Sequence, residues 1–253
     1  MDINTKNIAV LFHGKLRDKE LPYRNDISCL VLRHFNDNYP NFNIDYFGHI
    51  WCENNLDYTC YGNNIISEKN TDYYDTINMA YNKCINVLNN SNSISNTDGV
   101  KGRMFAQISN LISISKVIDL FNDKKKKTYE YIILFRYDYI VFENIQILNS
   151  IDNDTFYLNK HGAYDTSGES VFILSENKLH YFQELLQNVL DAKVIPVYHL
   201  YFYDYFVNVK KMNYKILDYS VGVNCEQVSL LHLHNTNPVL FNYIKNSNIL
   251  LIS

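Results

Sequence analysis

The sequence predicts an α/β fold with a mostly parallel central sheet flanked by helices. Two short apolar runs, residues 8–12 and 44–47, are separated by the helical stretch 21–35, and this strand–helix–strand order is typical of a parallel sheet. Residues 131–135 form an unbroken apolar run, as expected of a strand buried on both faces. Residues 103–121 have the periodicity of an amphipathic helix. Its apolar face holds Met104, Ile108, Leu111, Ile118 and Phe121.

The remaining elements are predicted from the same signals. Residues 76–88 form a helical patch, and residues 89–99 are rich in Asn and Ser, which indicates a loop. Further strands are expected at 155–158, 171–174 and 215–217, and further helices at 176–190 and 199–209. Ser175 is a suitable N-cap for the helix that follows it. The chain shows no internal repeat and no Pro/Gly/Ser-rich linker, so residues 1–253 are expected to form a single domain.

The composition argues against several classes of protein. The 253 residues are 47% hydrophobic, enough for a globular core, and the net charge of −4 leaves no basic excess to bind nucleic acid. The cationic block at 124–127 is interpreted as a solvated loop, with a phosphate or membrane patch as the alternative. Five cysteines without a CxxC pair argue against a disulfide framework and a zinc site. With no signal-like opening and no apolar run of about 20 residues, we expect a cytoplasmic protein without a transmembrane segment.

Charged residues end the most apolar strand. The run 131–135 stops at Arg136, Tyr137 and Asp138. Because charged groups are rarely buried without partners, we interpret this end as a site at the carboxyl edge of the sheet, where ligands commonly bind. Asp138 would hold a divalent metal and Arg136 would meet a phosphate. The alternative is an Arg–Asp pair that caps a strand in an ordinary core.

Four short motifs follow one another along the chain. They are Gly14 and Arg17 after the first strand, His49 and Trp51 after the second, Gln107 in the helix before YEYIILFRYD, and Glu169 in SGESVFIL. In this order they resemble motifs of GT-A-type nucleotide-sugar glycosyltransferases. Similar arrangements occur in polysaccharide and lipopolysaccharide glycosyltransferases of bacteria and in glycosyltransferases of large DNA viruses.

The resemblance implies a single GT-A-like, Rossmann-like domain, with a nucleotide-binding half at about 1–140 and an acceptor half at about 141–253. It also implies an enzyme that moves a sugar from a nucleoside diphosphate sugar to a glycan or glycoconjugate acceptor. An inverting mechanism is one outcome, and the sequence leaves the stereochemistry open. Donor contacts are expected from Gly14, Arg17, Arg103, Gln107, Arg136 and Asp138.

The resemblance further implies a metal, Mn²⁺ or Mg²⁺, on the donor diphosphate. In GT-A enzymes a D-x-D tripeptide binds it, whereas Arg136 here replaces the first acid and leaves only Asp138. Arg136 could take over part of the cation's role by neutralising phosphate oxygens directly. His232 or His234 could complete the metal site, and the alternative for each is a surface or hydrogen-bonded core histidine.

The acceptor side is predicted from four residues. Glu169 matches the position of the general base that takes the acceptor proton, Asp165 is the rival, and ordinary loop acids are the alternative. Trp51 is suited to stacking on a sugar, although a single tryptophan is more often a core residue. Asp204 could meet the acceptor or could simply be solvated.

The helical stripe of Arg103, Gln107 and Asn110, spaced i, i+4 and i+7, carries the same ambiguity. It is either a donor-binding stripe or a solvated face of the helix.

Two other functions stay open. A catalytically inactive carbohydrate-binding protein on the same scaffold would explain the missing first acid and the 22 tyrosines. A nucleotidyltransferase usually needs clustered carboxylates, which this sequence does not offer at close spacing. The phosphate loop GxxxxGK[ST], the dinucleotide fingerprint GxGxxG, the GxSxG elbow and HExxH are all absent from the sequence.

Overall fold

The computed structural model describes residues 6–15, 41–52, 64–90, 98–137, 151–161, 164–197 and 200–217. Within them a seven-stranded sheet has the order β3-β2-β1-β4-β6-β5-β7. The strands are β1 (Lys6–Lys15), β2 (Phe42–Trp51), β3 (Ile65–Glu68), β4 (Tyr131–Arg136), β5 (Thr155–His161), β6 (Tyr164–Leu174) and β7 (Asn213–Leu217). Strand β6 is antiparallel to β4 and β5, and every other neighbouring pair is parallel. The predicted mostly parallel α/β sheet is confirmed.

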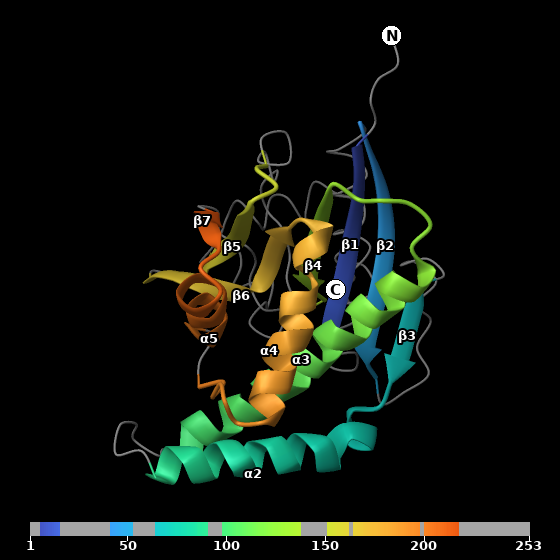
Figure 1. The fold of residues 1–253 in the computed structure, drawn as a ribbon. Coiled ribbons are helices and arrows are strands. Elements are labelled where there is room, and N and C mark those ends of the chain that lie inside the picture. The colour runs from blue at the N-terminus through green and yellow to red at the C-terminus, as the bar shows by residue number, and fades with distance from the viewer. Residues whose placement is uncertain are drawn as a thin grey trace, which may run out of the picture.

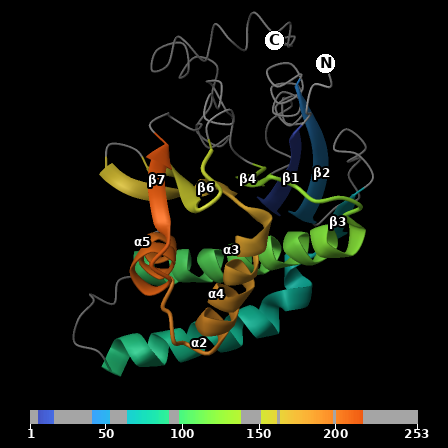
Figure 2. The ribbon, with the colours of Figure 1, turned by 45° about the horizontal axis from the view of Figure 1, so that its top comes forward.

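The described helices cover one face of this sheet, as Figures 1 and 2 show. They are α2 (Tyr74–Asn90), α3 (Asp98–Lys124), α4 (His180–Leu190) and α5 (Leu200–Tyr203), with short 3₁₀ helices at Asn70–Tyr73 and Glu176–Lys178 and a π-helix at Asp204–Val209 directly after α5. Helix α3 packs on β1 and β2, α5 packs on β6, and α2 lies outside against α3 and α4. Helix α3 is therefore sandwiched between the sheet and α2.

Alternation along the central strands buries both faces of the sheet. Ala9 and Leu11 point to the helix α3 side, whereas Val10 and Phe12 join a separate cluster on the opposite face. All four are fully or almost fully buried. This explains the unbroken apolar runs, because a strand covered on both faces gains from an apolar residue at every position.

Within the described ranges, the stretch Arg103–Lys124 of α3 is the one helix long and apolar enough to cross a membrane by length and composition. Of an 18-residue window within this stretch, 67% is buried inside the fold, as in a core helix.

Several predicted boundaries need correction. Strand β3 was not predicted, because four residues between polar segments give too short a periodic signal. Ser175 occupies an N-cap position, but its hydroxyl donates to Asn177 Oδ1 at 2.7 Å and makes no capping bond. A short 3₁₀ turn, Glu176–Lys178, precedes α4. The predicted helix 21–35 lies outside the described residues.

Candidate active site

Strand β1 is the point at which the strand order of the sheet reverses. After β1 the chain passes to β2 on one side, and β4 later pairs with β1 on the other side. In open α/β sheets, ligands bind outside the carboxyl ends of the strands at such a point. Gly14 is the penultimate residue of β1 and Arg136 is the last residue of β4. The residues expected to bind the donor thus end two adjacent strands.

A cavity of about 250 Å³ opens at this switch point. Its described lining comes from the ends of three strands, from the turn before α2 and from the first half of α3: Gly14, Lys15, Trp51, Asn70, Phe105, Ala106, Gln107, Ser109, Asn110 and Arg136. Four residues singled out from the sequence, Gly14, Trp51, Gln107 and Arg136, therefore meet around one cavity, although they come from four different elements.

The cavity is electropositive along its described lining. Lys15 and Arg136 contribute cations, and no carboxylate lies among the described lining residues. Gly14 has φ +108°, a left-handed conformation that glycine adopts at little cost, and a Cβ built on it would meet no atom of the described residues within 4 Å. The backbone at Gly14 is therefore open to a ligand. Cations beside an open backbone suit an anionic, oxygen-rich group.

His13, which is fully buried, and Asn110, a partly buried residue of the lining, form a polar pair at the cavity. His13 pairs in register with Arg136, and both lie on the α3 side of the sheet. Burial and the nearby Arg136 guanidinium lower the pKa of His13 to about 3, so its ring is neutral at pH 7. Its Nδ1–H donates to Asn110 Oδ1 at 3.0 Å. Among the described residues, neither His13 Nε2 nor Asn110 Nδ2 has a hydrogen-bond partner, although both atoms are buried.

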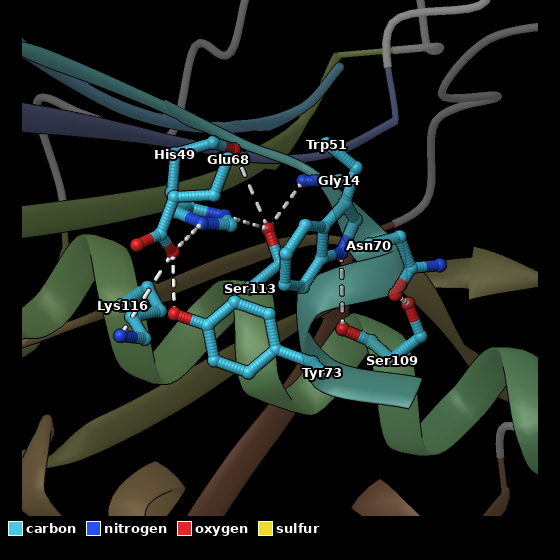
Figure 3. Close-up of polar contacts among 9 residues, drawn as sticks. All are labelled: Gly14, His49, Trp51, Glu68, Asn70, Tyr73, Ser109, Ser113 and Lys116. Carbon is cyan, nitrogen blue, oxygen red and sulfur yellow. Dashed lines mark hydrogen bonds and ion pairs between the residues drawn. The ribbon is translucent and has the colours of Figure 1, made fainter. Parts of the chain in front are cut away.

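A second polar chain runs from the edge of the sheet to Gly14 (Figure 3). The Gly14 backbone N–H donates to Ser113 Oγ at 2.8 Å. Ser113 Oγ also lies 2.8 Å from His49 Nδ1, and His49 Nε2 lies 3.0 Å from Glu68 Oε2. Glu68 accepts a further bond from Tyr73 Oη at 2.9 Å. Ser113 and His49 are fully buried, so the chain passes through the interior between α3 and the sheet.

The Glu68 carboxylate determines which atoms of this chain carry the protons, because a carboxylate can only accept hydrogen bonds. Burial lowers the pKa of His49, and the bond to Glu68 opposes this only in part, so the ring is neutral. Burial alone would raise the pKa of Glu68, but hydrogen bonds from His49 and Tyr73 bring it below its ordinary value. His49 Nε2 must then carry the proton donated to Glu68, which leaves the Nδ1 lone pair to accept from Ser113.

Trp51 forms the adjoining wall of the cavity. Its indole is only 3% exposed, and its Nε1–H donates to the Ser109 carbonyl at 3.2 Å. Tyr73 packs against the indole with ring centroids 5.2 Å apart, and His49 packs edge-on at 4.5 Å. The core position and the site position expected for Trp51 are therefore compatible, because the indole belongs to the core and also lines the cavity. Stacking on a sugar stays a prediction.

Comparison of the sequence finds no family model and no curated protein that matches the chain. Among solved structures, the fold is similar to a glycosyltransferase involved in the glycosylation of the major capsid of PBCV-1, with 13% identity over 83% of this chain and 81% of that chain and a TM-score of 0.43. It is similar to the galactosyltransferase LgtC in complex with donor and acceptor sugar analogues, with 10% identity, coverage of 81% and 72%, and a TM-score of 0.43. It is also similar to mouse xyloside xylosyltransferase 1, with 10% identity, coverage of 93% and 92%, and a TM-score of 0.46.

All three structures are glycosyltransferases, the class that the sequence motifs resemble. Their identities are 13% or lower and their TM-scores are below 0.5, so we draw no conclusion about the reaction from them.

The three residues of the polar stripe on α3, Arg103, Gln107 and Asn110, lie in different surroundings. Gln107 is buried, lines the cavity and accepts a hydrogen bond from Tyr201 Oη at 3.2 Å. Asn110 also lines the cavity, whereas Arg103 is exposed and is not among its described lining residues. Gln107 is therefore not on a solvated face, whereas Arg103 is exposed, and donor contacts from these residues stay a prediction. Asp204 is exposed on the turn after α5, where Asn208 Nδ2 donates to its Oδ1 at 2.9 Å.

The remaining site predictions are not tested by the described residues. Arg17, Asp138, His232 and His234 lie outside them. Asp165 and Glu169 fall within β6 itself and not in a loop before a strand, because β6 pairs with β5 as far as Tyr164; their side chains are not described. In the described part of the chain, no group of three His, Cys, Asp or Glu side chains could hold a metal ion. A metal site on Asp138 with a late histidine stays a prediction.

Sequence reasoning missed Ser113 and Glu68 as members of the polar chain, and it missed the role of His49. His49 was noted only as part of a motif, although its position two residues before Trp51 places both on one face of β2. Ser113 lies two turns beyond Phe105 and Ala106 in α3, where a small hydroxyl in a helix gives no signal of its own. Glu68 ends the strand that was not predicted.

Proposed function

We propose that the protein is a glycosyltransferase that moves a sugar from a nucleoside diphosphate sugar to a glycan or glycoconjugate acceptor. The observation that carries the proposal is the cavity at the switch point between β1 and β4, where Gly14 and Arg136 meet. This place in the fold, the two cations and the open glycine backbone all suit a diphosphate. The motif resemblance supports the same class.

The buried polar atoms of the His13–Asn110 pair support the proposal independently. Buried polar atoms are nearly always hydrogen-bonded in folded proteins. Asn110 lines the cavity and its Nδ2 has no partner among the described residues, so this amide is placed to donate to a ligand oxygen. An amide donor beside the Arg136 guanidinium provides the kind of group that binds phosphate or sugar oxygens.

In the proposed reaction, an acceptor hydroxyl attacks the anomeric carbon of the donor sugar, and the bond from that carbon to the diphosphate oxygen breaks. Arg136, with Lys15 beside it, would neutralise the charge that develops on the leaving diphosphate. Glu169, with Asp165 as the rival, would take the proton of the hydroxyl, and an inverting outcome belongs to this assignment. A divalent metal on Asp138 would add Lewis-acid stabilisation of the same leaving group.

The test is a thermal-shift screen of the purified chain against UDP-, GDP-, dTDP- and CMP-sugars, with and without Mn²⁺, followed by an assay of nucleotide release. A donor that binds only the native state raises the melting temperature by mass action. Arg136→Met is expected to weaken donor binding about 10- to 150-fold, because a hydrogen bond to a charged group contributes about 1.5–3 kcal/mol. Lys6→Met, at the opposite end of β1 and 40% exposed, is the matched control and should bind as the wild type does.

The outcomes separate the candidate functions. Donor binding with nucleotide release that depends on Arg136 supports the transferase. Glycan binding by calorimetry, without affinity for any of these nucleotide sugars, would instead establish the inactive carbohydrate-binding protein. An Arg136→Met variant that binds the donor as tightly as Lys6→Met would refute the assignment of the cavity.

A further inference from the structure

We propose that Glu68, His49 and Ser113 form a positioning relay that fixes the His13–Gly14 peptide at the mouth of the cavity. The relay deepens the proposed function, on which the identity of the ligand rests. None of the three residues is among the described residues that line the cavity. They act through the backbone of β1, so we describe them as positioning residues and not as catalytic ones.

The peptide between His13 and Gly14 is held from both sides. Its N–H donates to Ser113 Oγ on α3 at 2.8 Å, and its carbonyl accepts from the Tyr137 N–H just after β4 at 3.2 Å. Beyond this peptide, Gly14 turns into the left-handed region and Lys15 enters the cavity lining. The orientation of the peptide therefore sets where the open glycine backbone and the Lys15 backbone lie relative to Arg136.

The protons of the chain make Ser113 an obligatory acceptor for Gly14. Because His49 donates Nε2–H to Glu68, its Nδ1 can only accept, and the Ser113 proton points to it at 2.8 Å. The His49 carbonyl, 3.3 Å from the same oxygen, is a second acceptor for that proton. A lone pair of Ser113 is thereby left facing the Gly14 N–H. The charge of Glu68 polarises each bond of the chain in turn.

One consequence concerns how a phosphate is bound. Many phosphate sites use backbone N–H groups of a glycine-rich turn as donors. Here the Gly14 N–H is committed to Ser113, so it cannot be one of those donors. An anion in the cavity would be met by side-chain donors, Lys15, Asn110 and Arg136, while glycine contributes only the space for close approach. The relay keeps that space in a fixed place.

Glu68 is the member best suited to mutation. Its side chain is 29% exposed at the edge strand, so Glu68→Gln removes the charge without opening the core. Ser113→Ala removes the central hydroxyl and leaves the Gly14 N–H and His49 Nδ1 without their partner. Glu130→Gln is the matched control, since Glu130 is a 43% exposed acid that pairs with Lys6 at the opposite end of the sheet.

The first measurement needs no ligand. With ¹⁵N-glycine labelling, the chain shows only eight glycine amides, and ¹⁵N-histidine labelling reports the His49 tautomer. We expect the Nε2–H tautomer in the wild type, and an upfield shift of the Gly14 amide proton in Glu68→Gln and Ser113→Ala but not in Glu130→Gln. Exchange of this amide should quicken about tenfold in Ser113→Ala, the loss of one hydrogen bond. An Nδ1–H tautomer, or a Gly14 amide indifferent to Glu68→Gln, overturns the relay.

The second measurement is calorimetric binding of pyrophosphate and of the nucleotide sugar that stabilises the wild type most. Glu68→Gln should bind both about three- to tenfold more weakly, with Glu130→Gln unchanged. If Glu68→Gln has a lower melting temperature but unchanged affinity, the three residues have only a structural role and the proposal is overturned. If the wild type binds no nucleotide sugar, the proposed function fails while the glycine spectrum still decides on the relay.

Discussion

Acid should destabilise this protein through His13 well before its carboxylates are protonated. Burial and Arg136 lower the pKa of His13 in the folded state to about 3, whereas an unfolded histidine titrates near 6.5. Above about pH 6.5 both states are neutral and the stability is complete. As the pH falls below that value, His13 binds a proton in the unfolded state but not in the folded state. Stability is therefore lost progressively until the pH reaches the pKa of the folded state.

The size of the effect follows from these two pKa values. Between about pH 7 and about pH 5, the single His13 proton is expected to remove about 2 kcal/mol from the free energy of unfolding. This is a large part of a typical stability of about 5–15 kcal/mol. The pKa of His49 is lowered by burial as well, so it contributes in the same direction. The window ends near pH 5 because carboxylates such as Glu68 dominate the pH dependence below it.

The assay is urea unfolding of the wild type and of His13→Gln at several pH values across this window. The variant can still donate to Asn110 but has no proton to gain, so its free energy of unfolding should fall about 2 kcal/mol less than that of the wild type. Leu11→Ala is the control for lost packing, because Leu11 is fully buried on the same face of β1. It should cost about 2–5 kcal/mol at every pH and keep the wild-type pH dependence. Equal pH dependence in the wild type and His13→Gln would refute the assignment.

Two further predictions concern Gly48 and the two proposed catalytic acids. Gly48→Ala should destabilise the fold by about 1–3 kcal/mol in urea unfolding, because the added methyl would overlap the buried Tyr137 hydroxyl. The double variant with Tyr137→Phe should recover part of this loss. If the effects of the two substitutions on the free energy of unfolding simply add, the clash is contradicted. Asp138→Ala and Glu169→Gln should each abolish most nucleotide release while leaving the melting temperature within a few degrees, and full activity in either variant would remove that residue from its proposed role.

The sequence was sufficient to predict the parallel sheet and part of the cavity lining. Arg136 could be found because it ends an unbroken apolar run, and ligands commonly bind at the carboxyl edge of such a sheet. Gly14, Gln107 and Trp51 could be found only as members of motifs. The burial of Gln107 was not predictable, because a polar stripe on a helix fits a solvated face as well as a binding site.

The polar chain could not be predicted, for a different physical reason. Glu68 lies on β3, a four-residue edge strand that pairs with β2 and has no periodicity of its own. Ser113 and Ser109 sit on α3 between residues that are fully buried, and a helix covered on both sides shows no clear boundary between apolar and polar faces. Only the packing of α3 against the sheet reveals which serines meet the strand ends.

Four residues of α3 contact the ends of strands, and these contacts help the fold to tolerate polar groups in its interior. Burying such groups costs free energy unless they find partners. The Ser109 carbonyl accepts a hydrogen bond from Trp51 of β2, and Asn110 accepts one from His13 of β1. Ser113 bonds Gly14 of β1 and His49 of β2. Lys116 lies 3.8 Å from Glu68 of β3. These four positions span two turns of α3, so one helix contacts the carboxyl ends of three neighbouring strands. An apolar helix face could also pack against β1 and β2, but it would offer no acceptor for the Gly14 N–H, which Ser113 provides here.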